Sequence, residues 1–202
     1  MSVCTLSDVK DRLGIESSET DYDDSINIII AGLVEMFNNK TNRKLIITDE
    51  AVTEYLSSYS HYLFLRRYPV VTITSIKEAY DFDFDSKTAL VANTDFRLLK
   101  EGEKGLVARL YGTWPVGIPD SIQVVYRGGY TAAGQTPGDG ETALPDDIRE
   151  AAIEQASFIH KRRHDIGLQS QSFDGGSINK SAPMKLLPMV EDILKPHRRL
   201  EI

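Results

Sequence analysis

Apolar residues follow a helical period at both ends of this chain and a period of two in its middle. Residues 5–44 have the pattern of a short helix, an acidic turn and a long amphipathic helix. Residues 145–202 have that of a third helix, a Gly/Ser/Asn loop, a short fourth helix and a basic tail. We therefore predict an α+β fold. A small helical bundle is built from both chain ends, 1–44 and 145–202, and an antiparallel β-rich region at 45–144 is inserted and packed on it as a single structural unit.

The first two helices have start and stop signals. Thr5 can cap the first helix with Asp8 at its third position, and Gly14 can end it. The acidic residues at 21–24 favour the start of the second helix, because carboxylates stabilise the positive end of the helix dipole. One face of that helix carries apolar residues at helical spacing, which are Ile26, Ile29, Ile30, Leu33 and Phe37. We expect this face to lie in the core.

Short alternating segments predict the strands of the insert. They lie at 62–65, 71–73, 96–98, 106–110 and 122–126. Turn residues separate or follow them, among them the pair Gly128 and Gly129. No crossover helix fits between the segments, so we predict antiparallel hairpins. Trp114, flanked by glycine and proline, is expected to plug one end of this sheet.

Prolines mark the second half of the bundle. Residues 131–144 are predicted to be an exposed connection, and Pro145 suits the first turn of the third helix. Residues 168–182 are polar and glycine-containing, which predicts a loop. We expect the fourth helix to be entered at Pro188 and ended by Pro196.

Composition limits what the chain can bind. The formal net charge of −7 argues against tight binding of nucleic acid through its phosphates. Cys4 is the single cysteine, so no intrachain disulfide can form, and we expect a partly buried thiol. The N-terminus has no apolar signal region, and no apolar run is long enough to cross a bilayer. We expect the protein to fold in a reducing cytoplasm and to make no contact with a membrane.

Asp81, Asp83 and Asp85 alternate like the first three ligands of a calcium loop. The rest of the loop does not match. Ser86 stands where the sharp turn needs glycine, and Ala92 stands where a bidentate glutamate is needed. A solvated strand edge, or charges that discourage edge-to-edge pairing, is the favoured interpretation.

His160 and His164 are four residues apart on the third helix, a spacing that can hold zinc. The residues between them are Lys161, Arg162 and Arg163, which repel a cation. We expect instead a cationic helix end that complements the helix dipole and faces a partner.

Glycine pairs occur at 128–129 and 175–176, but neither is followed by the Lys-Ser/Thr of a phosphate-binding loop. Turn and hinge use explains both pairs. We predict no catalytic, cofactor-binding or metal site, and we expect the chain to act through its surfaces.

Several short motifs occur one after another along the chain. They are Leu-Ser-Asp-Val-Lys at 6–10, Leu-Gly-Ile at 13–15, Thr-Asn-Arg at 41–43, Tyr-Pro-Val at 68–70, Trp-Pro at 114–115, Val-Val-Tyr-Arg-Gly-Gly-Tyr at 124–130 and Leu-Pro-Asp-Asp-Ile at 144–148. With this order and spacing, nearly the whole chain resembles the head–tail connector (head-completion, or adaptor) proteins of tailed double-stranded DNA phages and prophages. The likeness is to the longer branch with a β-rich insert. Asn42 departs from the pattern, because glycine is usual there.

The resemblance implies a structural protein of the virion, placed at the head–tail junction and assembled in the cytoplasm of a bacterial host. It implies a homo-oligomer, a ring of twelve copies docked beneath the portal protein. The ring extends the DNA channel and offers a platform for a neck or tail-completion protein. DNA passes through it without specific binding, and an acidic lumen suits that passage.

The resemblance also directs attention to two groups of residues. The basic tail is expected to bind the portal through Lys195, His197, Arg198 and Arg199. A frayed, solvated terminus is the alternative for that tail. The glycine-containing loop is expected to order against a neighbouring copy or to line the channel through Phe173, Asp174, Gly175 and Gly176.

Three other functions stay open. One is a different neck or tail-completion protein of the same particle. Another is a small enzyme that uses His160, His164 or the three aspartates at 81–85. The third is a DNA-binding regulator, which the acidic start of the second helix disfavours, since only Lys40, Arg43 and Lys44 near its end are basic.

Overall fold

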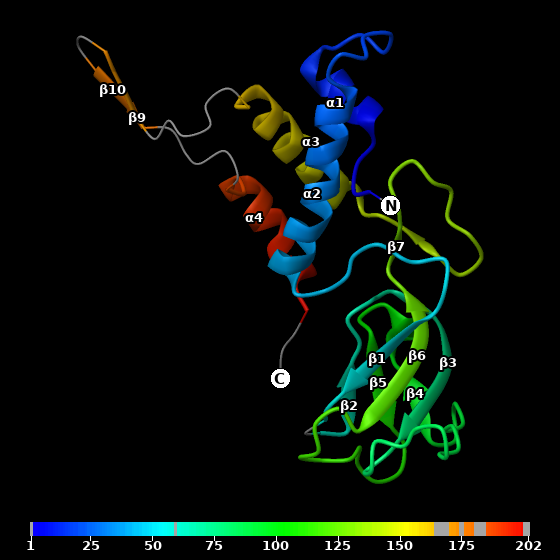
Figure 1. Ribbon diagram of the computed structural model, residues 1–202. Coiled ribbons are helices and arrows are strands. Elements are labelled where there is room, and N and C mark those ends of the chain that lie inside the picture. Colours follow the sequence, from blue (N-terminus) through cyan, green and yellow to red (C-terminus); the bar gives the residue numbers. More distant parts are fainter. Residues whose placement is uncertain (1, 59, 164–169, 174–175, 180–184, 200–202) are drawn as a thin grey trace. The chain divides into compact units, whose positions relative to one another are not determined.

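The computed structural model describes residues 2–58, 60–163, 170–173, 176–179 and 185–199 (Figure 1). The chain divides into two compact units. Residues 1–41 and 144–198 form the helical unit, and residues 42–143 with 199–202 form the β unit. Helices and antiparallel sheets together make the predicted α+β fold. The packing of the insert on the helical core as one structural unit stays a prediction.

The first helix, α1 (Leu6–Leu13), begins and ends where the sequence predicts. The Thr5 hydroxyl accepts a hydrogen bond from the Asp8 amide at 3.1 Å, and the Asp8 carboxylate accepts one from the Thr5 amide at 2.9 Å. This reciprocal capping satisfies two amides that have no partner inside the helix. Gly14 follows with φ 70°, a left-handed conformation that glycine adopts without strain.

The two longer helices pack against each other through faces of small and apolar residues. They are α2 (Asp23–Thr41) and α3 (Asp146–Lys161). The predicted stripe of α2 is confirmed, although Ile29 is only half-buried. Pro145 occupies the N-cap of α3, one position before the predicted first turn. The short helix α4 (Pro188–Leu194) begins at Pro188 as expected and continues into a 3-10 turn, η2 (Lys195–His197), so that Pro196 lies inside that turn.

Six short strands form two three-stranded sheets in the β unit. One sheet has the order β1-β6-β3, from Val52–Leu56, Ile122–Gly128 and Val70–Glu78. The other has the order β2-β5-β4, from Tyr62–Phe64, Leu106–Arg109 and Phe96–Leu98. All pairs within these sheets are antiparallel, as predicted. The prediction of hairpins is wrong for all but β4 and β5, because the other pairs join strands that are distant in sequence; β4 and β5 are linked by the 3-10 turn η1 (Lys100–Gly102).

The core of the β unit contains every second residue of β6, because buried and half-buried residues alternate along this strand. Ile122, Val124 and Tyr126 are fully buried. In β5 the buried residue is Val107, whereas Leu110 at the end of the predicted alternation is exposed. Trp114 is fully buried in the same core, as expected.

Gly128 and Gly129 bend the chain between β6 and the short strand β7 (Tyr130–Thr131) rather than closing a hairpin. A Cβ atom on Gly128 would lie 2.6 Å from the Arg67 carbonyl oxygen, and Gly129 has φ 115°. The close approach of two backbones therefore requires glycine. β7 pairs in parallel with β8 (Thr142–Ala143) across the connection at 131–144, whose residues 134–140 are exposed.

The predicted loop at 168–182 contains two strands, β9 (Ser170–Phe173) and β10 (Gly176–Asn179), which pair in antiparallel register. The loop prediction is wrong for these eight positions. Serine, glutamine and asparagine gave no apolar alternation from which a strand could be read. Among the helices that the structure describes, none is long and apolar enough to span a membrane.

Candidate assembly surfaces

The start of α4 is held by a buried glutamine of α3. Gln155 is fully buried, and its side-chain amide donates to the Lys185 carbonyl oxygen at 3.1 Å. Its carbonyl oxygen accepts from the Leu187 amide at 2.8 Å. Gln155 thus satisfies two backbone groups in the segment that leads into α4, which would otherwise have no hydrogen-bond partner. The sequence contains no signal of this clamp.

Two of the four residues predicted to bind a portal are exposed at the end of α4. Lys195 forms an ion pair with Asp192, one turn earlier, at 2.6 Å. Hydrogen bonding to Asp192 raises the pKa of Lys195. Arg198 is exposed, and within the described part of the chain its side chain makes no hydrogen bond or ion pair. Lys195 and Arg198 therefore present positive charge to the solvent.

The other two are engaged within the chain. His197 Nε2 lies 2.8 Å from Asp147 Oδ2 at the start of α3. Arg199 belongs to the β unit, where its guanidinium donates to the Phe64 carbonyl oxygen at 2.6 Å. These contacts tie down the terminal segment, so through residue 199 it is not the frayed end that was the alternative.

Of the residues predicted for the ring or channel loop, two lie in the strands. Phe173 is the last residue of β9, and Gly176 is the first of β10, directly opposite in register. Asp174 and Gly175 lie outside the described residues. The described part of the segment is therefore a pair of antiparallel strands, where the sequence predicts an irregular loop.

His160 does not face a partner, contrary to the prediction. It is 3% exposed, and its ring meets the Tyr22 ring edge-on with centroids 5.4 Å apart. The Arg163 guanidinium also lies over the Tyr22 ring, 5.0 Å from its centroid. His160 belongs to the buried face of α3 because it continues the spacing of Ala152 and Ala156. His164 lies outside the described residues.

The three aspartates of the insert lie in an exposed loop after β3. The Lys87 ammonium contacts Asp81 at 2.9 Å, and this hydrogen bond lowers the pKa of Asp81. Asp83 accepts a hydrogen bond from the Ser86 amide at 3.4 Å. The prediction of a strand edge is wrong, since these residues follow the strand rather than belong to it. Across the described ranges, no three His, Cys, Asp or Glu side chains are grouped as metal ligands.

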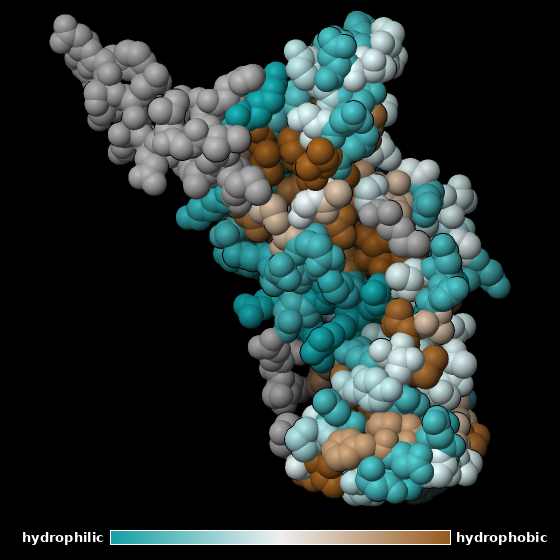
Figure 2. Space-filling model, in the orientation of Figure 1, coloured by the Kyte–Doolittle hydropathy of each residue, from teal (hydrophilic) through white to brown (hydrophobic). Residues whose placement is uncertain are grey.

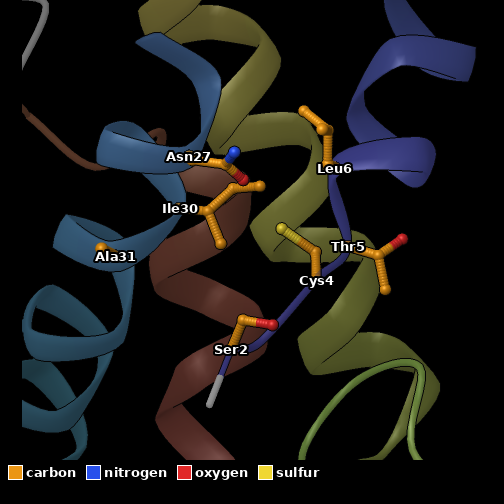
Figure 3. Close-up of a pocket in the computed structure, with 7 residues that line it drawn as sticks. All are labelled: Ser2, Cys4, Thr5, Leu6, Asn27, Ile30 and Ala31. Atoms are coloured by element: carbon orange, nitrogen blue, oxygen red, sulfur yellow. The ribbon is translucent and has the colours of Figure 1, made fainter. Parts of the chain in front are cut away.

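A hollow of about 350 Å³ lies between the N-terminal segment and α2. Cys4 and Leu6 line it from one side, and Asn27, Ile30 and Ala31 line it from α2 (Figure 3). Cys4 is fully buried, beyond the partial burial expected, and this burial raises the pKa of its thiol to about 12. A thiol that stays protonated at neutral pH is a poor nucleophile, so Cys4 contributes packing rather than reactivity.

Comparison with known proteins identifies the family. The family described as "Head completion protein" matches residues 2–200. Among curated proteins, none matches the chain. Among solved structures, a chain in "Virion of native gene transfer agent (GTA) particle" has a TM-score of 0.60 at 17% identity, covering 98% of this chain and 90% of that one.

Two further structures are similar. A chain in "Neck of empty GTA particle computed with C6 symmetry" has a TM-score of 0.59 at 16% identity, covering 98% of this chain and 90% of that one. A chain in "Neck of native GTA particle computed with C12 symmetry" has a TM-score of 0.52 at 15% identity, covering 98% and 89%. These likenesses establish the fold. Because the family match spans almost all of its residues, this chain belongs to the head completion protein family, as a structural protein of the head–tail junction of a phage-like particle.

Proposed function

We propose that the protein is a head–tail adaptor that assembles as a ring of twelve copies beneath the portal. The ring extends the DNA channel and gives a platform to the neck or tail-completion protein that follows. The family match over residues 2–200 is the observation that carries this proposal. The similar gene transfer agent chains come from neck structures with sixfold and twelvefold symmetry, which supports a ring. The protein acts through these contacts and catalyses no reaction.

The charge of the chain suits a DNA channel. A formal net charge of −7 on each copy gives a ring of twelve a strongly negative field. Like charge on the lumen wall prevents the phosphates from adhering, so DNA slides through without specific binding.

We assign the portal contact to the basic end of the chain. Lys195 and Arg198 are exposed and supply the charge, while His197 and Arg199 anchor the segment through Asp147 and the Phe64 carbonyl oxygen. We assign a contact with a neighbouring copy, or a place along the channel, to the segment of the paired strands β9 and β10, through Phe173, Asp174, Gly175 and Gly176.

The test uses purified DNA-filled heads that carry the portal but lack this protein. Wild-type protein is mixed with the heads, and the fraction that sediments with them is measured. The double variant Lys195→Glu/Arg198→Glu is expected to lose most of that binding, because both charges face the solvent. The matched control is Arg97→Glu/Lys104→Glu, which changes the same charge at two exposed positions of the β unit.

Two results would contradict the proposal. If the Lys195→Glu/Arg198→Glu variant binds as well as the control, the basic end is not the portal contact. If the wild-type protein ignores heads and instead sediments with purified tails, the chain is a tail-completion protein, which is the alternative within the same particle.

A further inference from the structure

Exposed apolar side chains gather at one end of the β unit. Of the ten large hydrophobic residues that are exposed in the described ranges, eight belong to this unit. Five of them are more than half exposed, and we name them the loop-end surface: Tyr80 (66%), Phe82 (58%), Val91 (58%), Tyr111 (79%) and Val116 (54%). This end of the unit shows brown and tan side chains among teal ones in Figure 2. Apolar side chains gathered in this way mark an interaction site.

The loops that carry this surface all leave the sheets at the same end. Leu56, the last residue of β1, and Glu78, the last of β3, both pair with Ile122 at the start of β6. The β1–β2, β3–β4 and β5–β6 loops therefore lie together, as Figure 1 also shows. Buried Trp114 in the β5–β6 loop donates its indole N–H to the His61 carbonyl oxygen of the β1–β2 loop at 2.9 Å.

Further hydrogen bonds join the three loops. The Asp120 amide donates to the Ser57 hydroxyl at 2.9 Å, which connects the β5–β6 and β1–β2 loops. The Leu110 amide donates to the Asp95 carbonyl oxygen at 2.9 Å, which connects the β5–β6 and β3–β4 loops. A surface fixed in this way loses little conformational entropy when a partner binds.

Phe82 is displayed by its own backbone. Its φ of 61° is left-handed, a conformation that bulky side chains rarely adopt. Two residues later Phe84 is buried and packs against Tyr55, with ring centroids 5.5 Å apart. The Lys77 ammonium donates to the Phe84 carbonyl oxygen at 2.9 Å. The loop is thus anchored at Phe84 and holds Phe82 in the solvent, and strain of this kind is typical of functional positions.

The charge around this surface selects the class of partner. The three loops contain five aspartates and a single lysine, Lys87, which is paired with Asp81. Asp83, Asp85 and Asp120 are exposed among the aromatic residues. This charge repels nucleic acid and acidic lipid surfaces, and it attracts a protein surface with lysines or arginines at its rim.

We propose that the loop-end surface docks the neck or tail component that follows this protein, and that the partner offers apolar pockets with a basic rim. This inference rests on the proposed adaptor function and assigns residues to its outer contact. Aromatic side chains buried in pockets supply most of the binding free energy at such interfaces, so Tyr80, Phe82 and Tyr111 are the residues on which docking depends.

The experiment separates head binding from tail joining. Heads lacking this protein are first mixed with the triple variant Tyr80→Ser/Phe82→Asn/Tyr111→Ser, and the sedimented fraction is measured. Purified tails are then added, and tailed particles are counted by electron microscopy. The matched control is Ile28→Ser/Met189→Ser, which removes the two exposed large apolar side chains of the helical unit, 73% and 50% exposed.

The triple variant is expected to bind heads as the wild type does and to yield at least about tenfold fewer tailed particles. The control is expected to do both normally. Normal tail joining by the triple variant overturns the inference. Loss of head binding, or a changed oligomeric state, overturns it as well, because the surface then faces the portal or a sister copy. If the wild type itself does not bind heads, the proposed adaptor function is wrong. This result is distinguishable from one in which only the docking inference is wrong, because in that case the wild type binds heads.

A second variant tests the charge and keeps the aromatic side chains. Asp83→Asn/Asp85→Asn/Asp120→Asn removes only exposed carboxylates, so the fold is retained. Tail joining by the wild type is expected to slow as salt is raised, because salt screens the attraction between opposite charges. The variant is expected to join tails more slowly at low salt and to lose this salt dependence. An unchanged rate and an unchanged salt dependence contradict a basic-rimmed partner.

Discussion

Arg149 on α3 donates two hydrogen bonds to the Asp8 carboxylate on α1, at 2.6 Å and 3.1 Å. Burial raises the pKa of Asp8, but the hydrogen bonds from Arg149 and Thr5 outweigh it and hold that pKa below its usual 3.8. Asp8 therefore caps its own helix and joins it to the third one. This pair has a consequence for the pH dependence of stability.

We predict that Asp8→Asn lowers the unfolding free energy by about 0.5–1 kcal/mol at pH 7. The asparagine oxygen can still accept the hydrogen bond from the Thr5 amide, but the ion pair with Arg149 is lost. The loss is modest because the Arg149 side chain is partly exposed. A carboxyl with a lowered folded-state pKa stabilises the fold above its unfolded pKa. That stabilisation is lost as the pH falls through the folded pKa. The difference between the two proteins should thus be constant above about pH 5, begin to shrink near 3.8, and vanish only once the pH lies below the lowered folded-state pKa. Urea unfolding over this range measures it, with Asp11→Asn on the same helix as control; a difference that persists in acid would refute the assignment.

Tyr126 makes a different kind of internal contact. Its hydroxyl donates to Glu54 at 2.6 Å and accepts from the Arg67 amide at 3.0 Å, inside the core. Tyr126→Phe should lower the unfolding free energy by about 1–3 kcal/mol, because it leaves the Arg67 amide without its partner and removes one of the hydrogen bonds to the Glu54 carboxylate. Thermal unfolding measures the change. Tyr55→Phe, at an exposed ring, should change it by less than about 0.5 kcal/mol, and equal effects would show that the hydrogen bonds do not matter.

Two glycines should respond in opposite directions to alanine. Gly128→Ala should destabilise the protein by about 2–3 kcal/mol, because the new Cβ atom would meet the Arg67 and Pro69 carbonyl oxygens at 2.6 and 2.9 Å. Gly32→Ala should stabilise it by about 0.5–1 kcal/mol, since it lies inside α2 and a Cβ atom there meets nothing within 4 Å. Denaturant midpoints of both variants test this pair. Similar midpoints would contradict the close approach at Gly128.

Cys4 should be inert in the folded protein. Burial raises the pKa of its thiol to about 12, so almost no thiolate exists at pH 8. A thiol-specific reagent should label it only after denaturant is added, at the rate at which the chain unfolds. Rapid labelling of the native protein at pH 8 would show that the N-terminal segment opens.

Local signals predicted the helices well. The Thr5–Asp8 capping box, Gly14 and the Asp23 start act through contacts between residues that are near in sequence, so their effect can be read from the chain. The apolar stripe of α2 is equally local. His160 was misjudged because its basic neighbours indicate an exposed end, whereas the helical period places it inward against Tyr22.

The strand order could not be read in the same way. β6 lies between β1 and β3, and this choice depends on which strands bury their faces together, which alternation alone does not specify. β3 also contains two shifts of register, between Val70 and Thr72 and between Ile73 and Ser75, which break the period of two. The loop-end surface was missed for a similar reason. Phe82 and Phe84 alternate with aspartates as in a strand, and only the folded loop shows that one is buried and the other exposed.

The most direct test of the adaptor function is electron microscopy of DNA-filled, portal-bearing heads after the purified protein is added. We predict a ring of density below the portal at the vertex, with twelve copies and a central channel, and its absence when the Lys195→Glu/Arg198→Glu variant is used. The account would be contradicted if the heads show no added density while the same protein preparation binds purified tails.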